Sequence, residues 1–266
     1  MNPMLNIGIR AARAAGDQII RYIDRVQDLP VNSKGRNDFV TEVDRLAENV
    51  IIDTILKSYP QHSILAEESG EQGGGEYQWI IDPLDGTTNY LHAFPQFAVS
   101  IALKRRGVLE QAVVYDPLKQ ELFTASKGGG AYLNNRRIRV SRRQSLKGAL
   151  LGTGFPFGDS DRLEDFIASF RAIFPMTAGI RRAGAASLDL AYVACGRLDG
   201  FWEYNLNVWD IAAGVLLIEE AGGLVGDIYG GHSHLECGDV LTAPPKVFEE
   251  LLKALSPGKA GATGTS

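Results

Sequence analysis

The sequence WIIDPLDGTTNY, residues 79–90, joins an apolar run to two aspartates and a glycine turn. The run WII is typical of a buried strand, so Asp82 and Asp85 are predicted to emerge together at its C-terminal end. Sheets of α/β proteins bind their ligands at that edge. Pro83 fixes its own φ and restricts Asp82, whereas Gly86 allows a ligand to approach the backbone closely. The loop therefore indicates a ligand site, although an isolated D-x-x-D is more often an Asx turn with a helix cap.

The residues after Gly86 predict an anion site beside the two aspartates. Thr87, Thr88 and Asn89 supply hydroxyl and amide groups and are expected to begin a helical turn. The free backbone N–H groups at the start of such a turn attract an oxyanion such as phosphate. A cation site and an anion site are therefore expected side by side.

Other carboxylates follow apolar elements elsewhere in the chain. Glu67 and Glu68 follow the strand candidate SILA in LAEESGE, and no lysine or arginine stands near them in sequence. That segment fits a metal site and a solvated acidic loop about equally well. Asp210 follows Trp209 and opens the helix candidate DIAAGVLLIEEAG, where its position predicts an N-cap. Clustered carboxylates without a nearby histidine or cysteine favour Mg²⁺ or Mn²⁺ over zinc.

The first part of the chain predicts two helices and a sheet. Apolar residues at near-helical spacing predict a helix over residues 4–27, and residues 41–44 have capping-box spacing before a second helix. SILA and YQWII are typical of strands, and the GEQGGG segment between them is expected to be a flexible loop. FAVSIAL, QAVVYDP and ELFTA then predict an antiparallel sheet.

Strand and helix candidates alternate from residue 150 onward. The strand candidates are ALLGTG, DGFWEY, GGLVGDIY and DVLTA, and the helix candidates are LEDFIASFRAIF, SLDLAYVACG and DIAAGVLLIEEAG. This alternation predicts helices layered on a second sheet, and so an α/β fold. We expect residues 1–149 to carry the metal loops, residues 150–255 to complete the site, and residues 256–266 to form a disordered tail.

Composition is that of an ordinary enzyme rather than a disordered or fibrous chain. Of the 266 residues 45% are hydrophobic and 22% charged, and the net charge of −5 argues against bulk attraction to nucleic acid. Two cysteines, Cys195 and Cys237, are too few for a zinc framework or a secreted disulfide scaffold, so a reducing cytoplasm is expected. No apolar run has signal-peptide character or membrane-spanning length.

Three ordered segments, LAEESGE, WIIDPLDGTTNY and WDIAAGVLLIEEAGG, closely resemble the inositol monophosphatase family. The resemblance extends from Met1 to about Leu255 and is greatest to the bacterial SuhB branch of the family. It implies an αβαβα layered fold, a homodimer, and hydrolysis of phosphate monoesters, most of all inositol 1-phosphate, by water activated with Mg²⁺. It also implies inhibition by Li⁺ at the second metal site.

Matched positions imply a set of metal ligands and catalytic groups. The first Mg²⁺ would be held by Glu67, Asp82 and the backbone carbonyl of Leu84. The second would be held by Asp82, Asp85 and Asp210, and a weakly held third ion would be reached from Glu67 through water. Thr87 would orient and help to deprotonate the attacking water, with Asp44 behind it. For Asp44 a capping-box role is the competing interpretation, and both can hold for one side chain.

The resemblance also implies substrate contacts. The N–H groups of Gly86 and Thr87 would bind the phosphate, and Asp210 would also lie near the substrate. The alcohol part of the substrate would contact four further residues: Gly184, Ala185, Ala186 and Glu203. Glu203 would accept hydrogen bonds from polyol hydroxyls, against the alternative of an exposed strand-end glutamate. Relatives often carry Ser or Thr in place of Ala185, which puts selectivity for inositol in doubt. Lys34 matches a basic residue near the outer metal site.

A basic segment predicts a second kind of function. Residues 135–147, NRRIRVSRRQSLK, carry six basic residues and no acid: Arg136, Arg137, Arg139, Arg142, Arg143 and Lys147. The segment could contact RNA or a partner, and the family resemblance implies a role with RNA polymerase in transcription antitermination and ribosomal RNA synthesis. An exposed hairpin kept soluble by arginines is an equally good interpretation.

Three further alternatives stay open. The enzyme could instead be a related phosphatase of sugar bisphosphates or 3′-phosphonucleotides, with the same metals and a different pocket. His232 and His234, in the loop GGHSH, are predicted to be surface histidines. Arg181 and Arg182 could lie at a dimer interface or assist anion binding.

Overall fold

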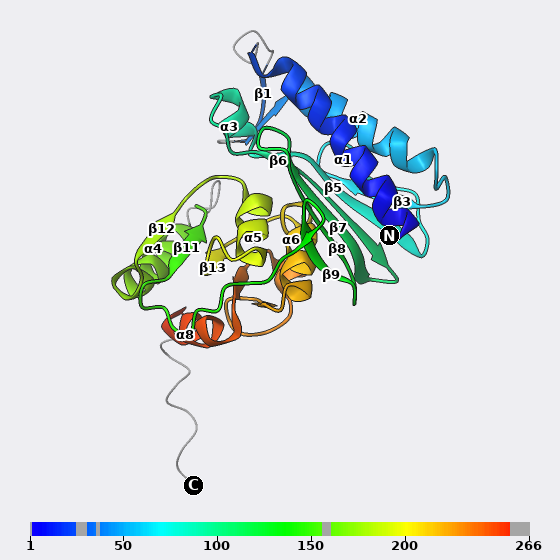
Figure 1. Cartoon of the computed structure of the whole chain (residues 1–266). Helices are drawn as coiled ribbons and strands as arrows, with labels where there is room; N and C mark the ends of the chain where they lie inside the picture. The colour runs from blue at the N-terminus through cyan, green and yellow to red at the C-terminus, as the bar shows by residue number, and fades with distance from the viewer. Residues whose placement is uncertain (1, 25–30, 36–37, 156–160, 256–266) are drawn as a thin grey trace.

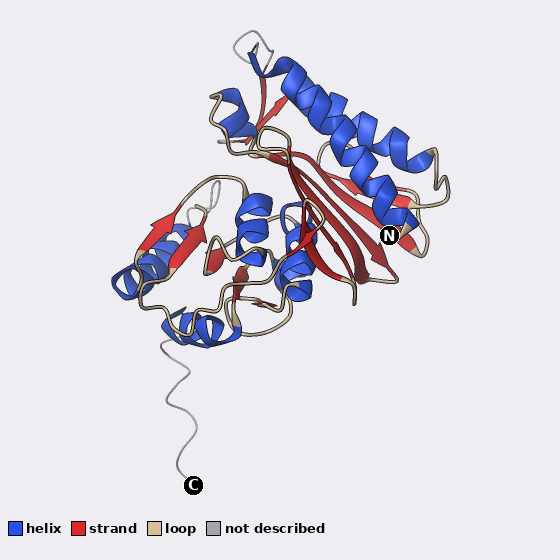
Figure 2. Cartoon of the chain, in the orientation of Figure 1, coloured by secondary structure: helices blue, strands red, loops and turns tan. Residues whose placement is uncertain are grey.

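Helices and sheets alternate in five layers along the molecule (Figures 1 and 2). The computed structural model describes residues 2–24, 31–35, 38–155 and 161–255, and of these residues 31–35, 38–41 and 161 are described by their backbone alone. The order is helix pair, eight-stranded sheet, helix pair, five-stranded sheet, helix pair. The predicted αβαβα sandwich is confirmed. The tail 256–266 lies outside the described residues.

The outer layer at the N-terminus holds α1 (Pro3–Tyr22) and α2 (Glu42–Leu56). The Asn2 side chain caps α1 by accepting a hydrogen bond from the Met4 N–H at 2.9 Å. Both helices are amphipathic and pack one apolar face onto the sheet. The predicted helix over residues 4–27 is too long, since α1 ends at Tyr22 and residues 25–30 lie outside the described part of the chain.

The eight-stranded sheet has the order β10-β9-β8-β7-β6-β5-β3-β4. Its strands are β3 (Ser63–Ala66), β4 (Gly70–Gln72), β5 (Tyr77–Asp85), β6 (Ala98–Arg105), β7 (Val108–Asp116), β8 (Glu121–Ser126), β9 (Gly130–Leu133) and β10 (Arg136–Arg137). Only the β3–β5 pair is parallel. The prediction of a loop over GEQGGG is partly wrong, because its first three residues form β4 at the sheet edge.

The middle layer, α5 (Ala186–Ala194) and α6 (Val208–Glu220), lies between the two sheets. Both helices are apolar on nearly all sides, as expected of a helix covered on every side. They approach closely at Gly214, where a Cβ would lie 2.5 Å from the Cβ of Leu190. At the far end of α6 the Glu220 carboxylate accepts hydrogen bonds from the Gly128 and Gly130 N–H groups, both at 2.6 Å.

The five-stranded sheet completes the second half of the chain. Its order is β12 (Gly179–Arg181), β11 (Leu150–Thr153), β13 (Gly200–Glu203), β15 (Val240–Ala243) and β14 (Leu224–Gly226). The outer layer of α4 (Asp161–Ile173) and α8 (Pro245–Leu255) packs on its outer face. Shorter elements are β1 (Val31–Gly35), β2 (Asp38–Thr41), α3 (Thr87–Leu91), the 3₁₀ turn η2 (Phe174–Met176) and α7 (His234–Cys237).

Among the described residues, no helix has both the length and the apolar character needed to cross a membrane. The division into residues 1–149 and 150–255 stays a prediction. It does correspond to the change from the first sheet to the second, because β10 ends at Arg137 and β11 begins at Leu150.

Candidate active site

The end of β5 forms a bulge that presents two aspartates and a carbonyl. Asp82 pairs with Ser100 and Asp85 with Ala98, so two residues on β5, Pro83 and Leu84, lie opposite the single residue Val99 on β6. The Asp82 Oδ1 accepts the Leu84 N–H at 2.9 Å, so an Asx turn is present as the simpler interpretation supposed. Asp82 is buried, whereas Asp85 also borders a cavity.

Gly86 makes the turn that follows possible. Its φ is +90°, and a Cβ there would lie 2.8 Å from the Gln96 carbonyl oxygen. The chain then enters α3, as the predicted helical turn requires, with Gly86 at its N-cap. The turn is tied to the second half of the chain by the Asn89 side chain, which donates to the Ala183 carbonyl at 2.9 Å.

The Thr87 hydroxyl lies between the metal loop and α2. Its oxygen is 3.0 Å from Asp44 Oδ1 and 3.0 Å from the Leu84 carbonyl oxygen. Asp44 stands in the first turn of α2 and is buried. Thr41, the partner of Asp44 in the predicted capping box, is described by its backbone alone. The pairing of Thr87 with Asp44 that the resemblance implied is present.

Glu67 follows β3, which runs parallel to β5. Because Ala66 aligns with Ile81, Glu67 is the neighbour of Asp82 across the two strands. The Glu67 N–H donates to the Ile81 carbonyl at 3.1 Å, which continues this alignment. Glu68 is anchored differently, since its N–H donates to the buried Glu48 carboxylate at 2.9 Å.

Asp210 approaches from the start of α6. The predicted N-cap assignment is wrong by three residues, because the helix begins at Val208 and Asn207 occupies the N-cap position. Asp210 is instead the third helical residue, and its Oδ2 accepts the Asn207 N–H at 2.7 Å. The carboxylate thus closes a capping box and also borders the cavity.

These carboxylates affect one another's ionisation. Burial raises the pKa of Asp82 well above its ordinary value, and Glu67, Asp85 and Asp210 raise it further by charge repulsion. Burial raises the pKa of Asp85 to about 6, although hydrogen bonds from Ser187 and Ala186 oppose the rise. A cation among these groups would reverse the repulsion.

The donor set fits a hard divalent cation by its chemistry. All four side chains offer carboxylate oxygens, the ligands that Mg²⁺ prefers. Within the described residues no three carboxylates, histidines or cysteines already converge as a coordination shell. Asp82, Asp85 and Asp210 accept hydrogen bonds from different neighbours, the N–H groups of Leu84, Ser187 and Asn207, which keep the three carboxylates directed at different groups.

A cavity of about 450 Å³ joins both halves of the chain at this point. Its lining contains most of the predicted site residues: Glu67, Asp85, Gly86, Thr87, Gly184, Ala185, Ala186, Glu203 and Asp210. The remaining three, Asp82, Leu84 and Asp44, are buried behind it. Thr88, Gly154, Arg182 and Leu206 complete the lining.

The C-terminal half forms the far wall of the cavity. Gly184 has a φ of +85° and lies beside Asn89, and the Ala185 side chain packs 3.3 Å from where a Cβ on Gly86 would be. Glu203 lies against Gly154, where any Cβ would overlap its carboxyl group. Burial raises the pKa of Glu203, as does Asp189, whereas Arg182 lowers it. Glu203 is therefore not the exposed strand-end glutamate of the alternative interpretation.

Several residues at the site were not predicted. Ser187 hydrogen-bonds Asp85, and Asp189 is a buried acid whose pKa is raised by burial and by Asp85. Nothing in the linear sequence connects Ser187 with an aspartate 102 residues away. Arg182 borders the cavity, and its guanidinium lies 4.9 Å from the Phe155 ring centroid. Of the two roles predicted for Arg182, anion binding is therefore compatible with its position.

Other predicted features lie away from the cavity lining. The prediction of surface histidines holds for His232 but is wrong for His234, which is 7% exposed and has a pKa lowered by burial. Arg143 of the basic segment forms an ion pair with Asp199 at 2.8 Å, so it has a structural role that the sequence did not suggest. The side chain of Lys34 lies outside the described residues.

The chain belongs to the inositol monophosphatase family, whose model matches residues 1–259. A relative, the Nus factor SuhB of Pseudomonas aeruginosa, is 57% identical over 263 residues and covers 97% of each chain. The crystal structure of extragenic suppressor protein suhB from Bartonella henselae matches with a TM-score of 0.94 and 42% identity, over 97% of this chain and 100% of that one. The inositol monophosphatase of Anabaena (Nostoc) matches with a TM-score of 0.85 and 42% identity, over 95% of each chain. The predicted family and its SuhB branch are confirmed.

Proposed function

We propose that this chain is a Mg²⁺-dependent phosphatase that hydrolyses phosphate monoesters, with inositol 1-phosphate as its substrate. The observation that carries the proposal is the buried Asp82, whose ionisation is opposed by Glu67, Asp85 and Asp210 beside the Gly86–Thr87 turn. Family membership supports the phosphatase class. The two or three Mg²⁺ ions, for which Mn²⁺ could substitute, would be held by Glu67, Asp82, Asp85, Asp210 and the Leu84 carbonyl.

When bound, Mg²⁺ would neutralise charge on the phosphoryl group and make water a better nucleophile. The chain supplies the remaining parts. The N–H groups of Gly86 and Thr87, at the start of α3, hold the phosphate oxygens. The Thr87 hydroxyl donates a hydrogen bond to Asp44, and its oxygen accepts a hydrogen bond from the attacking water. Asp44, buried behind it, keeps that hydroxyl in one orientation.

The far wall would recognise the alcohol. Glu203 accepts hydrogen bonds from hydroxyls, and the backbone around Gly184 and Ala186 supplies polar groups without side-chain bulk. Ala185 offers no hydroxyl, which removes one contact and would cost about 1 kcal/mol of binding. Arg182 on the same wall keeps sugar bisphosphates and 3′-phosphonucleotides as the second candidate substrates.

Metal dependence and substrate choice can be tested together. Asp85→Asn and Asp210→Asn should abolish Mg²⁺-dependent phosphate release from inositol 1-phosphate, while circular dichroism shows intact folding. Undiminished turnover in both variants would refute the metal assignment. Measuring kcat/KM for inositol 1-phosphate, glycerol 2-phosphate, fructose bisphosphate and adenosine bisphosphate, with and without Li⁺, then identifies the substrate class.

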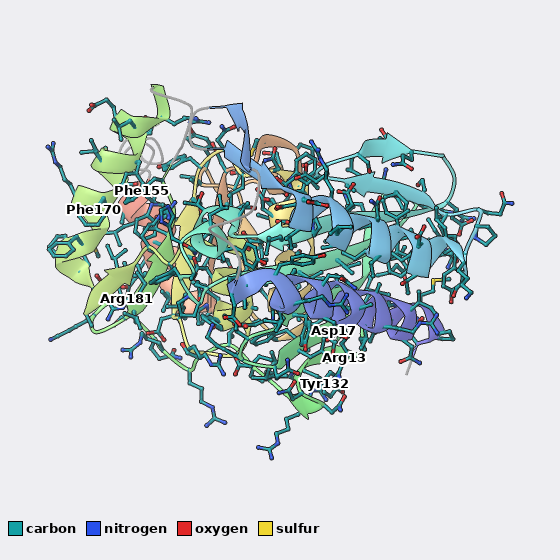
Figure 3. All side chains as sticks on the ribbon, turned by 90° about the horizontal axis from the view of Figure 1, so that it is seen from above. Arg13, Asp17, Tyr132, Phe155, Phe170 and Arg181 are labelled. Atoms are coloured by element: carbon teal, nitrogen blue, oxygen red, sulfur yellow. The ribbon has the colours of Figure 1, made fainter. Side chains whose placement is uncertain are left out.

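A second role with the transcription machinery is proposed from the basic segment. The relative from Pseudomonas aeruginosa is named a Nus factor, and this chain is 57% identical to it. The linear run holds no aromatic residue, but β10 pairs Arg137 with Tyr132, so the two side chains share one face of the sheet. Tyr132 lies on the same side of the molecule as Arg13 and Asp17 of α1 (Figure 3). An arginine beside a partly exposed aromatic ring suits contact with RNA.

Charge reversal tests this second role. Arg139→Glu with Arg142→Glu should abolish binding of single-stranded ribosomal leader RNA or RNA polymerase while leaving phosphatase activity unchanged. Arg143 should be spared, because its ion pair with Asp199 supports the fold. Arg45→Glu, which changes an exposed arginine on α2, is the matched control. Unchanged binding in the double variant would leave the segment a solvated loop.

We also propose that the chain forms a homodimer in the cytoplasm. A row of aromatic rings runs from Phe155 through Phe166 and Phe170 to Phe174, with successive centroids 5.3, 6.1 and 5.4 Å apart. Phe155 and Phe174 are 43% and 55% exposed, and β12 leaves a sheet edge beside them. Figure 3 shows Phe155, Phe170 and Arg181 at this end of the molecule. Phe174→Asp should convert a dimer into a monomer in light scattering, and an unchanged mass would contradict the interface.

A further inference from the structure

The helix α5 lacks a capping side chain of its own. Its N-cap position is occupied by Ala185, which makes no side-chain capping hydrogen bond. The first N–H groups of a helix need an acceptor, and an alanine there normally costs about 1 kcal/mol relative to Ser or Asp. Because Ser187 and Ala185 are buried, water is a poor substitute for that acceptor.

The acceptor comes from the other half of the chain. The Asp85 Oδ2 accepts the Ser187 N–H at 2.7 Å and the Ser187 hydroxyl at 2.5 Å. The Ala186 N–H also hydrogen-bonds this carboxyl group. Asp85 therefore caps α5 across 102 residues of sequence, from the bulge of the first sheet to the middle layer.

Ser187 is unusual among these donors because it uses two groups on one oxygen. Two bonds on Oδ2 fix the rotation of the carboxyl group, and so fix the direction in which Oδ1 points. Asp85 borders the cavity, whereas Ser187 is completely buried and cannot meet a substrate itself. Its hydroxyl can act on the reaction only through Asp85.

We propose that Ser187 is a positioning residue that orients Asp85 for Mg²⁺ and locks the metal loop to the start of α5. This inference rests on the proposed function, because it takes Asp85 as a metal ligand. The lock also fixes the position of the metal loop relative to the Gly184–Ala186 turn, which borders the same cavity. Metal binding and alcohol recognition are thereby held in one geometry by a single carboxyl group.

Ser187→Ala separates the hydroxyl from the backbone donors. The Ser187 and Ala186 N–H groups remain, so the helix keeps its cap and the variant should fold. Titration calorimetry of metal-stripped protein with MgCl₂ should show binding weakened on the order of tenfold, since a hydrogen bond to a charged group is lost. At saturating Mg²⁺, kcat should stay within about twofold of the parent chain.

Control variants distinguish the positioning role of Ser187 from the proposed metal site at Asp85. Ser63→Ala removes another buried serine hydroxyl, which donates to the Tyr77 carbonyl at 3.0 Å, and should leave Mg²⁺ affinity unchanged. Unchanged affinity in Ser187→Ala, with Asp85→Asn impaired, would overturn the role of Ser187 alone. Unchanged affinity in Asp85→Asn as well would overturn the metal site itself. If Ser187→Ala fails to fold, Ser187→Cys keeps a weaker donor and should show intermediate affinity, and parental affinity there would also overturn the role.

Discussion

The two halves of the molecule contribute to the cavity in opposite ways. The first half brings acids from strand ends, with Asp82 and Asp85 at the end of β5 and Glu67 directly after the neighbouring strand β3. The second half brings helix beginnings, with the N–H groups of α5 that Asp85 caps and the capping-box carboxylate Asp210 at α6. Strand ends concentrate negative charge at one edge, whereas helix N-termini offset negative charge. The carboxylates at the strand ends repel one another, so they need either the helix N-termini or a bound cation beside them to offset their negative charge.

The largest expected effect on activity comes from substituting two glycines that have left-handed backbone conformations, one in each half of the chain. Gly86→Ala would place a Cβ 2.8 Å from the Gln96 carbonyl oxygen, which is backbone and cannot move easily. Gly184→Ala would place one 2.7 Å from a guanidinium nitrogen of Arg182, the end of a flexible side chain. We expect Gly86→Ala to lower kcat/KM for inositol 1-phosphate by at least about 100-fold, and Gly184→Ala by about tenfold. Equal losses would mean that the two turns are equally rigid.

The next effect concerns the acids behind the first half. Asp44→Asn should lower kcat by about 100-fold with unchanged Mg²⁺ affinity, because it weakens the acceptor that orients the Thr87 hydroxyl. Glu48→Gln is the matched control, since Glu48 is a buried acid of the same helix that accepts the Glu68 N–H. A loss of kcat in both variants would point to a general disturbance of α2 rather than to the Thr87 contact.

Acidity should change the stability of the metal-free chain. The pKa of Asp82 is raised, and that of Asp85 is raised to about 6, so the folded chain binds more protons than the unfolded chain above the ordinary carboxyl value of 3.8. Stability from these groups therefore falls as pH rises through that window. By calorimetry, Tm should be several degrees lower at about pH 7.5 than at about pH 5 without Mg²⁺. Saturating Mg²⁺ should remove most of the difference, and a Tm that rises with pH in metal-free protein would contradict the repulsion.

The smallest effect should be on the far wall. Glu203→Gln keeps the shape of the side chain that lies against Gly154 but weakens an acceptor for hydroxyls. KM for inositol 1-phosphate should rise about fivefold, with a smaller change for glycerol 2-phosphate, which has fewer hydroxyls. A fall in kcat at saturating substrate would move Glu203 from recognition into the chemical step.

Sequence predicted the first half of the site better than the second, for a physical reason. The end of β5, the turn at Gly86 and the acids after β3 follow from short-range patterns, and the structure places them as expected. The helix beginnings depend on one or two residues of register, which local patterns define poorly. The assignment of Asp210 as N-cap was therefore wrong by three positions, although its approach to the cavity was predicted.

Contacts between distant segments were beyond the sequence. Ser187 and Asp85 come together only because α5 packs against the first sheet. Arg143 meets Asp199 only because the segment before β11 passes beside Gly196, just after α5. His234 is buried although it ends the polar, glycine-containing stretch GGHSH, because the 234–237 helix packs against α6. Each of these depends on tertiary packing that no local period records.

The middle layer has a consequence for how this molecule can change over time. A substitution in α1 or α8 is felt by one sheet, whereas α5 and α6 contact both sheets and each other, with no room for even a methyl group at Gly214. The helix α6 begins at the cavity with Asp210 and ends at Glu220, whose carboxylate accepts hydrogen bonds from the Gly128–Gly130 turn that precedes the basic segment. A substitution that shifts α6 will therefore alter both the cavity and the turn before the basic segment. The outer helix layers can therefore accept substitutions more freely. Substitutions in α5 and α6 affect the cavity and the basic segment together, so these two regions are expected to evolve together.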